Sequence, residues 1–259
     1  MTQVKAIVLR AAGINCDWET EYALELAGAK AQRIHINRLI ADITALEKFQ
    51  ILVFPGGFSY GDDVAAGKIL ANQIVHHLYE PIQKFIDDGK LVLGICNGFQ
   101  VLVKTGLLPG ITNNEPRVTI TYNDSGKYED RWVYLAPQTE KCIFLEPDRQ
   151  IYLPVAHAEG KVVTKDTDTL EKLKSAGYVA FKYVDENGKE GGYPINPNGS
   201  VDSIAGLTDT TGRVLGLMPH PERHVRPTQH PRWSRVKNEQ DADGITIFNN
   251  AVEYIQENF

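Results

Sequence analysis

Short apolar runs alternate with segments of helical periodicity along the first 110 residues of the chain. The runs combine β-branched and aliphatic residues and predict buried strands at residues 4–9, 31–36, 51–54 and 91–95. A weaker helical segment separates the second and third runs, and a long amphipathic segment spans residues 68–88. Because Pro81 falls inside that long segment, we expect it to form two helices. The alternation predicts a parallel sheet with helices on both faces.

The first helix is expected at residues 17–27, after the first strand. Trp18, Tyr22 and Leu26 recur there at helical spacing, and Gly28 follows as a C-cap. In open parallel sheets, ligands bind at the carboxyl ends of the strands. Functional residues are therefore expected just after the predicted strands.

Beyond about residue 112 the chain changes to shorter apolar runs separated by turn signals. These runs predict strands at residues 118–122, 131–135, 152–155, 161–164 and 179–184. Apolar residues at helical spacing predict a final helix at residues 244–257. We expect one α/β domain over residues 1–259, with a parallel part over 1–110 and a mixed or antiparallel extension of the same sheet over 111–259.

Composition places the chain among ordinary globular proteins and excludes several function classes. Its 259 residues are 42% hydrophobic and 23% charged, which suffices for a sizeable core. The net charge of −6 argues against nucleic acid as the main partner, since that calls for a basic face. No apolar run approaches the roughly 20 residues of a membrane span and no signal peptide is visible, so we expect a cytoplasmic protein. The three cysteines and seven histidines show neither a disulfide framework nor the spacing of metal ligands.

The segment Gly94-Ile95-Cys96-Asn97-Gly98 is the strongest chemical signal in the chain. It joins a predicted strand to a helical pattern, which is the context of a nucleophile elbow with cysteine in place of serine. Glycine suits a tight turn where a neighbouring backbone passes close by. The turn sets Cys96 beside the positive end of a helix dipole, which favours the attacking thiolate. We therefore expect covalent catalysis by Cys96, and we interpret Cys16 and Cys142 as small buried hydrophobes.

A cysteine nucleophile needs a base, and the base needs a group that orients it. Both are present in Pro219-His220-Pro221-Glu222, directly after a strand-like run at residues 213–218. In an extended segment, side chains two residues apart leave on the same face, so Glu222 can hydrogen-bond one imidazole nitrogen of His220. The other nitrogen then remains free for Cys96. The sequence predicts a triad of Cys96, His220 and Glu222.

A glycine-rich loop, Pro55-Gly56-Gly57, follows the third predicted strand. It is not a phosphate loop, because the Gly-Lys-Ser/Thr ending is absent. The loop is either a simple flexible connection or an oxyanion hole, in which the backbone N–H groups of Gly57 and Asn97 converge on developing negative charge. Gln100, one helical turn beyond Cys96, either reaches a bound substrate or packs at the helix N-terminus. The residues alone favour neither reading of Gln100.

Three motifs together identify a family. Gly-Ile-Cys-Asn-Gly-Phe-Gln at 94–100, Pro-Gly-Gly-Phe-Ser-Tyr-Gly-Asp at 55–62 and Met-Pro-His-Pro-Glu-Arg at 218–223 resemble the motifs of class I, or triad-type, glutamine amidotransferases. Segments at residues 13–17, 155–160, 193–200 and 205–208 are similar to the purine-biosynthetic branch of that family. The likeness covers nearly the whole chain and implies the flavodoxin-like fold of these enzymes.

The resemblance also implies a reaction. Cys96 would attack the side-chain amide of glutamine, His220 would pass a proton to the departing ammonia, and Glu222 would orient His220. A γ-glutamyl thioester would then be hydrolysed to glutamate. Ammonia would travel to a synthetase subunit, which uses ATP and Mg to convert formylglycinamide ribonucleotide to its amidine, and a small accessory subunit would join the complex. No cofactor is expected on this chain.

The family pattern brings further residues to the site. Those at the oxyanion hole would be Gly57 and Asn97, and those against glutamine would be Phe58, Gln100, His157 and Glu159. The family usually has glycine where Ala158 stands, so this position departs from the pattern. An extension at residues 224–235 is similar to the tail of large single-chain synthases. Its side chains are either packing residues or an interface with the synthetase, and they include His224, Arg226 and Trp233.

Three alternatives stay open on sequence alone. A glutaminase that serves another synthetase would carry the same triad. A cysteine hydrolase or glyoxalase of the related single-domain superfamily would share the fold and the elbow, although the Pro-His-Pro-Glu and Pro-Gly-Gly motifs count against it. A catalytically silent docking protein would have no chemical need for the whole triad.

Overall fold

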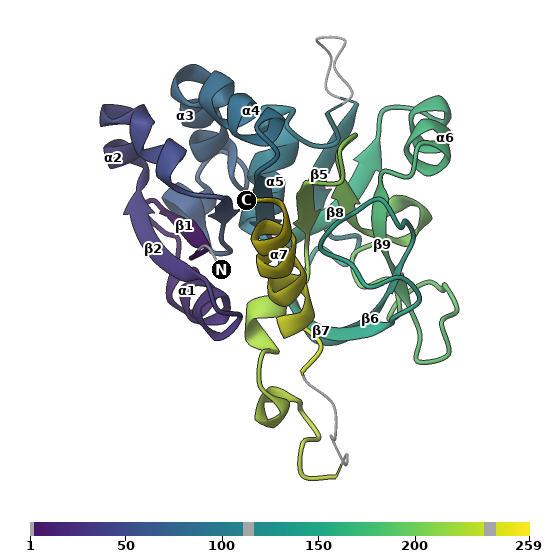
Figure 1. Cartoon of the computed structure of the whole chain (residues 1–259). Helices are drawn as coiled ribbons and strands as arrows, with labels where there is room; N and C mark the ends of the chain where they lie inside the picture. Colours follow the sequence, from purple (N-terminus) through teal and green to yellow (C-terminus); the bar gives the residue numbers. More distant parts are fainter. Residues whose placement is uncertain (1–2, 111–116, 236–241) are drawn as a thin grey trace.

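A nine-stranded mixed sheet forms the centre of the computed structural model, which describes residues 3–110, 117–235 and 242–259 (Figure 1). The strand order is β2-β1-β3-β4-β11-β10-β9-β6-β7. The first five are parallel: β2 (Lys30–His35), β1 (Lys5–Arg10), β3 (Ile51–Phe54), β4 (Leu91–Ile95) and β11 (Val214–Leu217). The other four are joined antiparallel: β10 (Ile204–Thr208), β9 (Val179–Val184), β6 (Glu129–Pro137) and β7 (Ile151–His157). The predicted α/β fold with a parallel part and a mixed extension is confirmed.

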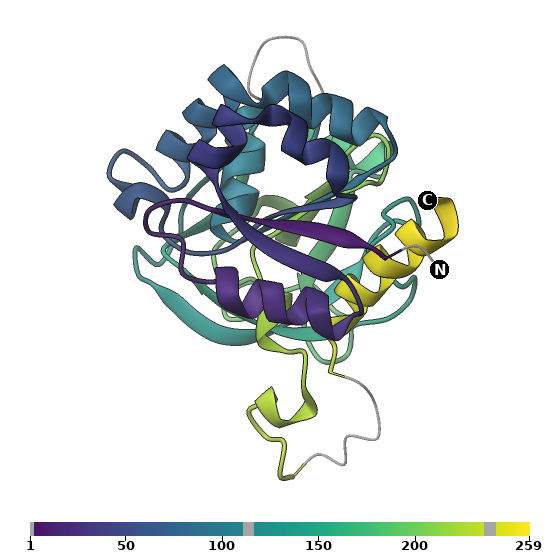
Figure 2. The ribbon, with the colours of Figure 1, turned by 60° about the vertical axis from the view of Figure 1, so that its left-hand side comes forward.

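Helices cover both faces of the parallel half of the sheet (Figures 1 and 2). On one face lie α1 (Asp17–Leu26) and the C-terminal α7 (Ile245–Asn258), which contact each other. The opposite face carries α3 (Lys68–His77), α4 (Tyr79–Asp87) and α5 (Asn97–Thr105). The remaining helices are α2 (Ile36–Ala41) and α6 (Thr167–Ser175), and short 3-10 helices include η1 (Ile43–Lys48), η2 (Ser59–Asp62), η3 (Val201–Ser203), η4 (Pro221–Arg223) and η5 (Pro227–Gln229).

The long amphipathic segment is divided in two, as predicted from Pro81. The first helix ends at His77, and the second begins at Tyr79. The break falls at Leu78 and Pro81 lies in the first turn of α4, where its missing N–H would have no intrahelical partner in any case. Proline therefore marks the start of the new helix instead of interrupting a continuous one.

Helix α1 forms where it was predicted, but its large apolar residues face outward. Trp18 is 67%, Leu26 46% and Tyr22 38% exposed. The side buried against the sheet and α7 carries the smaller Ala23 together with Leu24. Helical spacing therefore predicted the helix correctly, but it did not predict which side of the helix is buried.

Arginine side chains cover two of the exposed rings on α1. The guanidinium carbon of Arg33 lies 3.2 Å from the centroid of a Trp18 ring, and that of Arg226 lies 5.2 Å from the centroid of Tyr22. Such cation–π contacts contribute about 0.5–1 kcal/mol at exposed sites. Arg226 also donates hydrogen bonds to the Tyr22 hydroxyl, which ties the 224–235 extension to α1.

A second, two-stranded antiparallel sheet pairs β5 (Val118–Tyr122) with β8 (Glu159–Thr164). Both strands were predicted, but the expectation that they extend the main sheet is wrong. Only Ala158 separates β7 from β8, so the chain leaves the main sheet there. The reason lies in α5, which β5 contacts directly with Val118 and Ile120 buried. A strand that covers this helix cannot also continue the edge of the large sheet.

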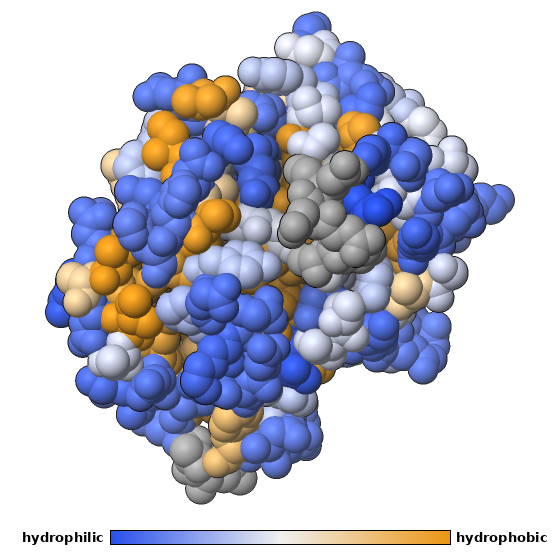
Figure 3. Space-filling view, turned by 90° about the horizontal axis from the view of Figure 1, so that it is seen from above, coloured by the Kyte–Doolittle hydropathy of each residue, from blue (hydrophilic) through white to orange (hydrophobic). Residues whose placement is uncertain are grey.

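The surface seen from above is mostly hydrophilic, and its hydrophobic side chains are divided into separate patches (Figure 3). Among the described residues, no helix combines the length and the apolar character that a membrane crossing requires.

Three segments reach the same edge of the sheet, at the carboxyl ends of adjacent parallel strands. β3, β4 and β11 are neighbours in that order. The glycine-rich loop follows β3, Cys96 follows β4, and the segment that leads to His220 follows β11. Residues from three distant parts of the sequence are thereby brought together where α/β proteins bind ligands.

Candidate active site

Cys96 occupies a strained turn between β4 and α5. Its φ of 50° and ψ of −105° lie in a region that residues with a side chain rarely adopt. The conformation is held from both sides, because the N–H of Cys96 donates to Leu217 O at 2.8 Å and its carbonyl accepts from Gln100 N–H at 3.1 Å. The helix begins at Asn97, so N–H groups without intrahelical partners lie next to the sulfur. This is the geometry of a nucleophile elbow.

The two glycines of the elbow are required by close backbone approach, as predicted. A Cβ on Gly98 would lie 1.8 Å from Phe54 O of the neighbouring strand. A Cβ on Gly94 would lie 2.8 Å from Gly98 O. Both distances are far inside van der Waals contact, so any side chain at these positions would force the turn apart.

His220 and Glu222 form a short, buried hydrogen bond. Nδ1 of His220 lies 2.6 Å from Oε1 of Glu222, and the two side chains are 2% and 0% exposed. The predicted extended geometry is wrong for Glu222, which belongs to the 3-10 helix η4 that Pro221 begins. The tight turn brings the carboxylate back to the imidazole, and this produces the contact that the extended segment was expected to give.

The charges around His220 favour its protonated form. Burial by itself lowers the pKa of the imidazole, but the Glu222 carboxylate and the Cys96 sulfur outweigh it, so this pKa stands well above its ordinary value. Nε2 of His220 is buried and makes no hydrogen bond of normal geometry among the described residues, but the sulfurs of Cys96 and Cys16 lie close enough to the ring to favour its charged form. The Cys96 sulfur lies 3.8 Å from Ala156 O. The arrangement therefore supplies a thiol, a protonatable imidazole and a carboxylate that holds it.

Asn97 connects the elbow to the glycine-rich loop through its side chain. Its Oδ1 accepts from Ser59 N–H at 3.2 Å, and its Nδ2 donates to Oδ1 of Asp62 at 3.2 Å and to Oε1 of Gln100 at 3.0 Å. The loop itself pairs with residues near the first strand, where Phe58 N–H donates to Gly13 O at 2.9 Å. Sequence reasoning assigned a role only to the backbone of Asn97, because a side-chain bridge between distant loops has no local signal.

A small cavity opens directly on Cys96. Its volume is about 40 Å³, room for roughly three water molecules. Its lining includes six residues that the sequence selected as site residues: Gly57, Phe58, Cys96, Gln100, His157 and Glu159. Ala158 also lines it, together with Asp62, Ala66 and Ala156, which the sequence had not selected. This enclosed space is small beside a typical site for a small ligand.

Polar contacts connect several of the residues that line the cavity, and a bound substrate would have to replace them. Nε2 of Gln100 donates to Glu159 O at 2.5 Å, and Oε1 of Glu159 accepts from Ala66 N–H at 3.4 Å. Asp62 lies on the same wall, and burial raises the pKa of its carboxyl group, with nearby Glu159 adding to the effect. Gln100 thus takes part in internal packing here, and its contact with a substrate stays a prediction.

His157 is a neutral histidine beside the cavity. Its Nδ1 lies 3.1 Å from Oδ1 of Asn123, an oxygen that also accepts from Gly160 N–H at 3.0 Å. Since the Nδ2 of Asn123 donates to His157 O at 2.8 Å, the amide orientation is set and Nδ1 of His157 must carry the proton. Its Nε2 is a buried acceptor with no partner among the described residues. Burial, followed by the charge of His220, lowers the pKa of His157 to about 3.

Replacing His157 by asparagine is expected to make the protein less sensitive to acid. The folded pKa is about 3 against an ordinary value of 6.5, so stability is fully present above pH 6.5 and falls as the pH decreases toward 3. In that window the imidazole is protonated in the unfolded chain and neutral in the folded chain. The free energy of unfolding therefore falls by about 1.4 kcal/mol for each pH unit of acidification. Urea unfolding at several pH values should show the slope reduced by that amount.

Exposed His77 on α3 provides the matched control for this experiment. The pH slope of His157→Asn is compared with that of His77→Asn, which makes the same substitution at an exposed position. An unchanged slope in His157→Asn would contradict the assignment of a neutral buried imidazole.

The extension at residues 224–235 projects from the lower edge of the molecule, in yellow-green (Figures 1 and 2). Its base is anchored, because the His224 ring packs edge-on at 5.1 Å from Trp132 and its Nδ1 lies 2.8 Å from Tyr152 O. Trp233, in contrast, is 58% exposed. Packing therefore accounts for His224, whereas an interface role for Trp233 stays a prediction.

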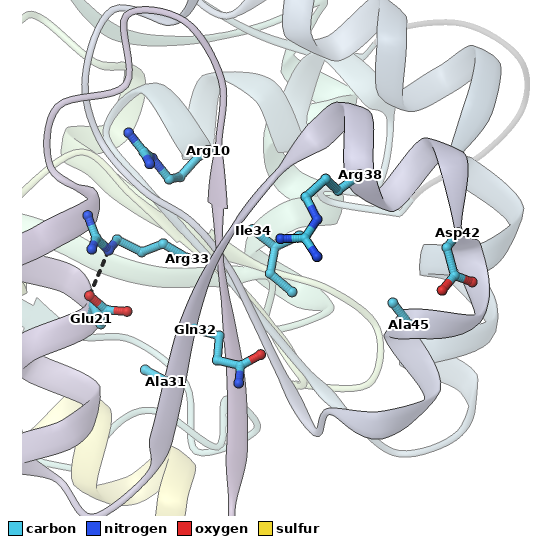
Figure 4. Close-up of a pocket in the computed structure, with 9 residues that line it drawn as sticks. All are labelled: Arg10, Glu21, Ala31, Gln32, Arg33, Ile34, Arg38, Asp42 and Ala45. Carbon is cyan, nitrogen blue, oxygen red and sulfur yellow. Dashed lines mark hydrogen bonds and ion pairs between the residues drawn. The ribbon is translucent and has the colours of Figure 1, made fainter.

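A larger hollow of about 430 Å³ lies beside β2, away from the elbow (Figure 4). Its lining includes Arg10, Arg33 and Arg38 together with Glu21. Two of these arginines are already paired, since Arg10 and Arg33 lie 2.8 and 3.6 Å from Asp17, and Arg33 lies 2.7 Å from Glu21. The hollow contains none of the triad residues, so size alone is a poor guide to the active site.

Comparison with known proteins places this geometry in a family. The CobB/CobQ-like glutamine amidotransferase domain matches the chain over residues 3–255. The phosphoribosylformylglycinamidine synthase subunit PurQ of Dehalococcoides mccartyi is 48% identical over 259 residues, which cover 99% of this chain and 100% of that protein. The subunit of the same name from Archaeoglobus fulgidus is 42% identical over 270 residues, covering 98% of each.

Solved structures agree with the sequence relatives. A structure described as PurLQS from Thermotoga maritima superposes with a TM-score of 0.74 at 30% identity, over 98% of this chain and 100% of that chain. A putative GMP synthase subunit from Thermoplasma acidophilum gives a TM-score of 0.59 at 15% identity and shows only that the fold is shared. The chain therefore belongs to the CobB/CobQ-like, class I glutamine amidotransferase family, among the relatives of phosphoribosylformylglycinamidine synthase subunit PurQ.

Proposed function

We propose that this chain is the glutaminase subunit of a phosphoribosylformylglycinamidine synthase. The observation that carries the proposal is the 2.6 Å bond between His220 and Glu222 beside a cysteine held in a nucleophile elbow. The identity of 48% to a PurQ subunit over nearly the whole chain supports this synthase over others that use the same triad. A single amidotransferase domain over residues 1–259 performs the reaction.

In the proposed reaction, the Cys96 sulfur attacks the side-chain carbonyl carbon of glutamine. Backbone N–H groups of Gly57 and Asn97 stabilise the negative charge that develops on the oxygen. The C–N bond breaks while His220 donates a proton to the departing ammonia, and a γ-glutamyl thioester remains on Cys96. His220 then takes a proton from water, which attacks the thioester and releases glutamate.

Glu222 keeps the imidazole oriented and balances its charge through both steps. A thiol, an imidazole and a carboxylate complete this chemistry, so it calls for no cofactor on the chain itself. ATP and Mg act on the synthetase partner, which receives the ammonia and amidates formylglycinamide ribonucleotide, and a small accessory subunit joins the complex. Since the three cysteines are free thiols, we also propose that the protein works in the reducing cytoplasm.

Partner binding is proposed to open the substrate cavity. The cavity holds only about 40 Å³, whereas sites for small ligands typically offer 300 Å³ or more. If glutamine were hydrolysed when no substrate was bound to the synthetase, the ammonia would be lost. A closed site in the free chain would prevent this loss, which suits the proposed role.

Glutamate release tests this function directly. The purified chain is assayed alone, and then with the candidate synthetase, ATP and formylglycinamide ribonucleotide. We expect slow release from the chain alone and a rise of at least about tenfold in the full mixture, the size of a typical coupling between sites. Equal release in both conditions would indicate an independent glutaminase, and no release in either would overturn the proposal.

A further inference from the structure

Cys16 is a second buried cysteine beside the triad. It lies immediately before α1 and is 1% exposed, which fits its interpretation from sequence as a small hydrophobe. That interpretation is incomplete, because polar groups surround the sulfur. Sγ of Cys16, a ring nitrogen of His220 and a carboxylate oxygen of Glu222 all lie within 4.8 Å of one another.

The hydrogen bonds of Cys16 fix the direction of its thiol. The S–H donates to Oδ1 of Asn15 at 3.3 Å, and the sulfur accepts from Nη2 of Arg223 at 3.1 Å. Arg223 is held in turn by Glu19, whose Oε1 lies 2.9 Å from its Nε. Burial raises the pKa of the Cys16 thiol to about 11, so it stays protonated near neutral pH. Cys16 is therefore not a second nucleophile.

The same sulfur limits the space available to the imidazole of His220. A Cβ on Gly56 would lie 2.8 Å from Cε1 of His220 and 3.0 Å from Sγ of Cys16. Ring and sulfur thus lie together beneath the Gly56 backbone. The Glu222 bond fixes the position of Nδ1, but one hydrogen bond still allows the ring to tilt about that contact. The Gly56 backbone and the Cys16 sulfur occupy the space into which the ring would tilt, so they restrict this motion.

We propose that Cys16 is a positioning residue for His220, which keeps the imidazole oriented so that Nε2 stays available to Cys96. This inference rests on the proposed function only for its kinetic readout. A neutral thiol suits the task, since it fills the space without taking the imidazole proton from Glu222. The sulfur accepts from Arg223 and lies within 4.8 Å of a ring nitrogen of His220, so it reaches both cationic groups without adding a charge of its own.

Cys16→Ala and Cys16→Ser test the proposal, with Cys142→Ala as the matched control. Cys142 is also a free, fully buried cysteine, and its neighbours are Thr208 and Phe144, not the triad. The first readout is kcat and KM for glutamine in the complex with the synthetase. We expect kcat to fall roughly 10- to 100-fold in Cys16→Ala with KM nearly unchanged, the cost of a small misplacement of a catalytic group. Serine, which keeps both hydrogen bonds, should restore part of the rate.

The second readout does not depend on activity. A proton in a hydrogen bond as short as that between His220 and Glu222 gives a far-downfield NMR signal, identified by its loss in Glu222→Gln. This signal should shift or broaden in Cys16→Ala and stay in place in Cys142→Ala.

Parental kcat and an unmoved signal in folded Cys16→Ala would overturn the proposal. So would an equal loss of rate in Cys142→Ala, because it would indicate general loosening of the core. If Cys16→Ala does not fold, Cys16→Ser decides: a displaced signal with a lower kcat supports the proposal, and parental values of both overturn it. If the parent complex itself released no glutamate, the proposed function would fail, and the NMR signal alone would still decide the role of Cys16.

Discussion

Replacing Cys96 by alanine is expected to lower glutamine-dependent amidation by about 10⁴- to 10⁶-fold, since losing the nucleophile of a triad leaves only binding and charge stabilisation. The structure holds this sulfur in a strained turn with φ 50° and ψ −105°, and such strain persists where the surroundings over-determine it. Amidation driven by free ammonia should continue at the parental rate. The thioester step is needed only to release ammonia from glutamine.

Two assays on the same complex separate these outcomes. Glutamate release and amidine formation are followed with glutamine, and amidine formation is then followed with an ammonium salt. Cys142→Ala, another buried cysteine variant, should match the parent in both assays. Retention of more than roughly one hundredth of the glutamine-dependent rate in Cys96→Ala would mean that another group attacks the amide. Loss of the ammonia-dependent rate would instead mean that the substitution disturbs the partner.

The centre of the parallel half was accessible from sequence because the strands there are buried on both faces. Ile51 to Phe54 and Leu91 to Ile95 form continuous apolar runs, and the strands β3 and β4 have those bounds. The elbow was equally accessible, since Gly94 and Gly98 mark the position of Cys96 from both sides. A local pattern sufficed in each of these cases.

What the sequence could not supply were the partners of each element. Alternation identified β5 and β8 as strands, but strand propensity carries no information on which sheet a strand joins. The helix α6 (Thr167–Ser175) and the strand β10 (Ile204–Thr208) were not predicted, although Asp166 caps the helix by accepting from Thr169 N–H at 2.7 Å. That helix is short and largely polar, so its apolar periodicity is faint.

The surroundings of the triad were the least accessible part of the site. Cys16 and Arg223 are 207 positions apart in the chain, yet their side chains are 3.1 Å apart. Such contacts depend on the order β1-β3-β4-β11 of the parallel strands, which brings the loop after β1 and the segment after β11 to the same edge of the sheet. The sequence around a single cysteine does not indicate which distant side chains it contacts. Cys16 was therefore interpreted only as a small buried hydrophobe.

Glu222→Gln is expected to lower kcat by about 10³- to 10⁴-fold, the usual effect of neutralising the orienting carboxylate of a triad. The carboxylate is fully buried, and its 2.6 Å bond to His220 leaves no room for water to replace it. Glu222 is also a principal reason why the pKa of His220 is raised, so this pKa should fall in the variant. The imidazolium, which donates a proton to the departing ammonia, would then lose that proton at a lower pH. The alkaline limb of the plot of kcat against pH should therefore move to lower pH.

Glu19→Gln supplies the matched control for this prediction, because Glu19 pairs with Arg223 at 2.9 Å and is partly exposed. It removes the same charge from the same neighbourhood without contacting the imidazole, so kcat and the position of the alkaline limb should stay close to parental values. The profiles are measured for the parent and both variants in the complex with the synthetase. A Glu222→Gln enzyme within about tenfold of the parent would show that the Gly56 backbone and the Cys16 sulfur orient His220 without help from the carboxylate. A large loss in Glu19→Gln as well would point to the summed charge around Arg223, and the specific bond between His220 and Glu222 would then no longer explain the rate.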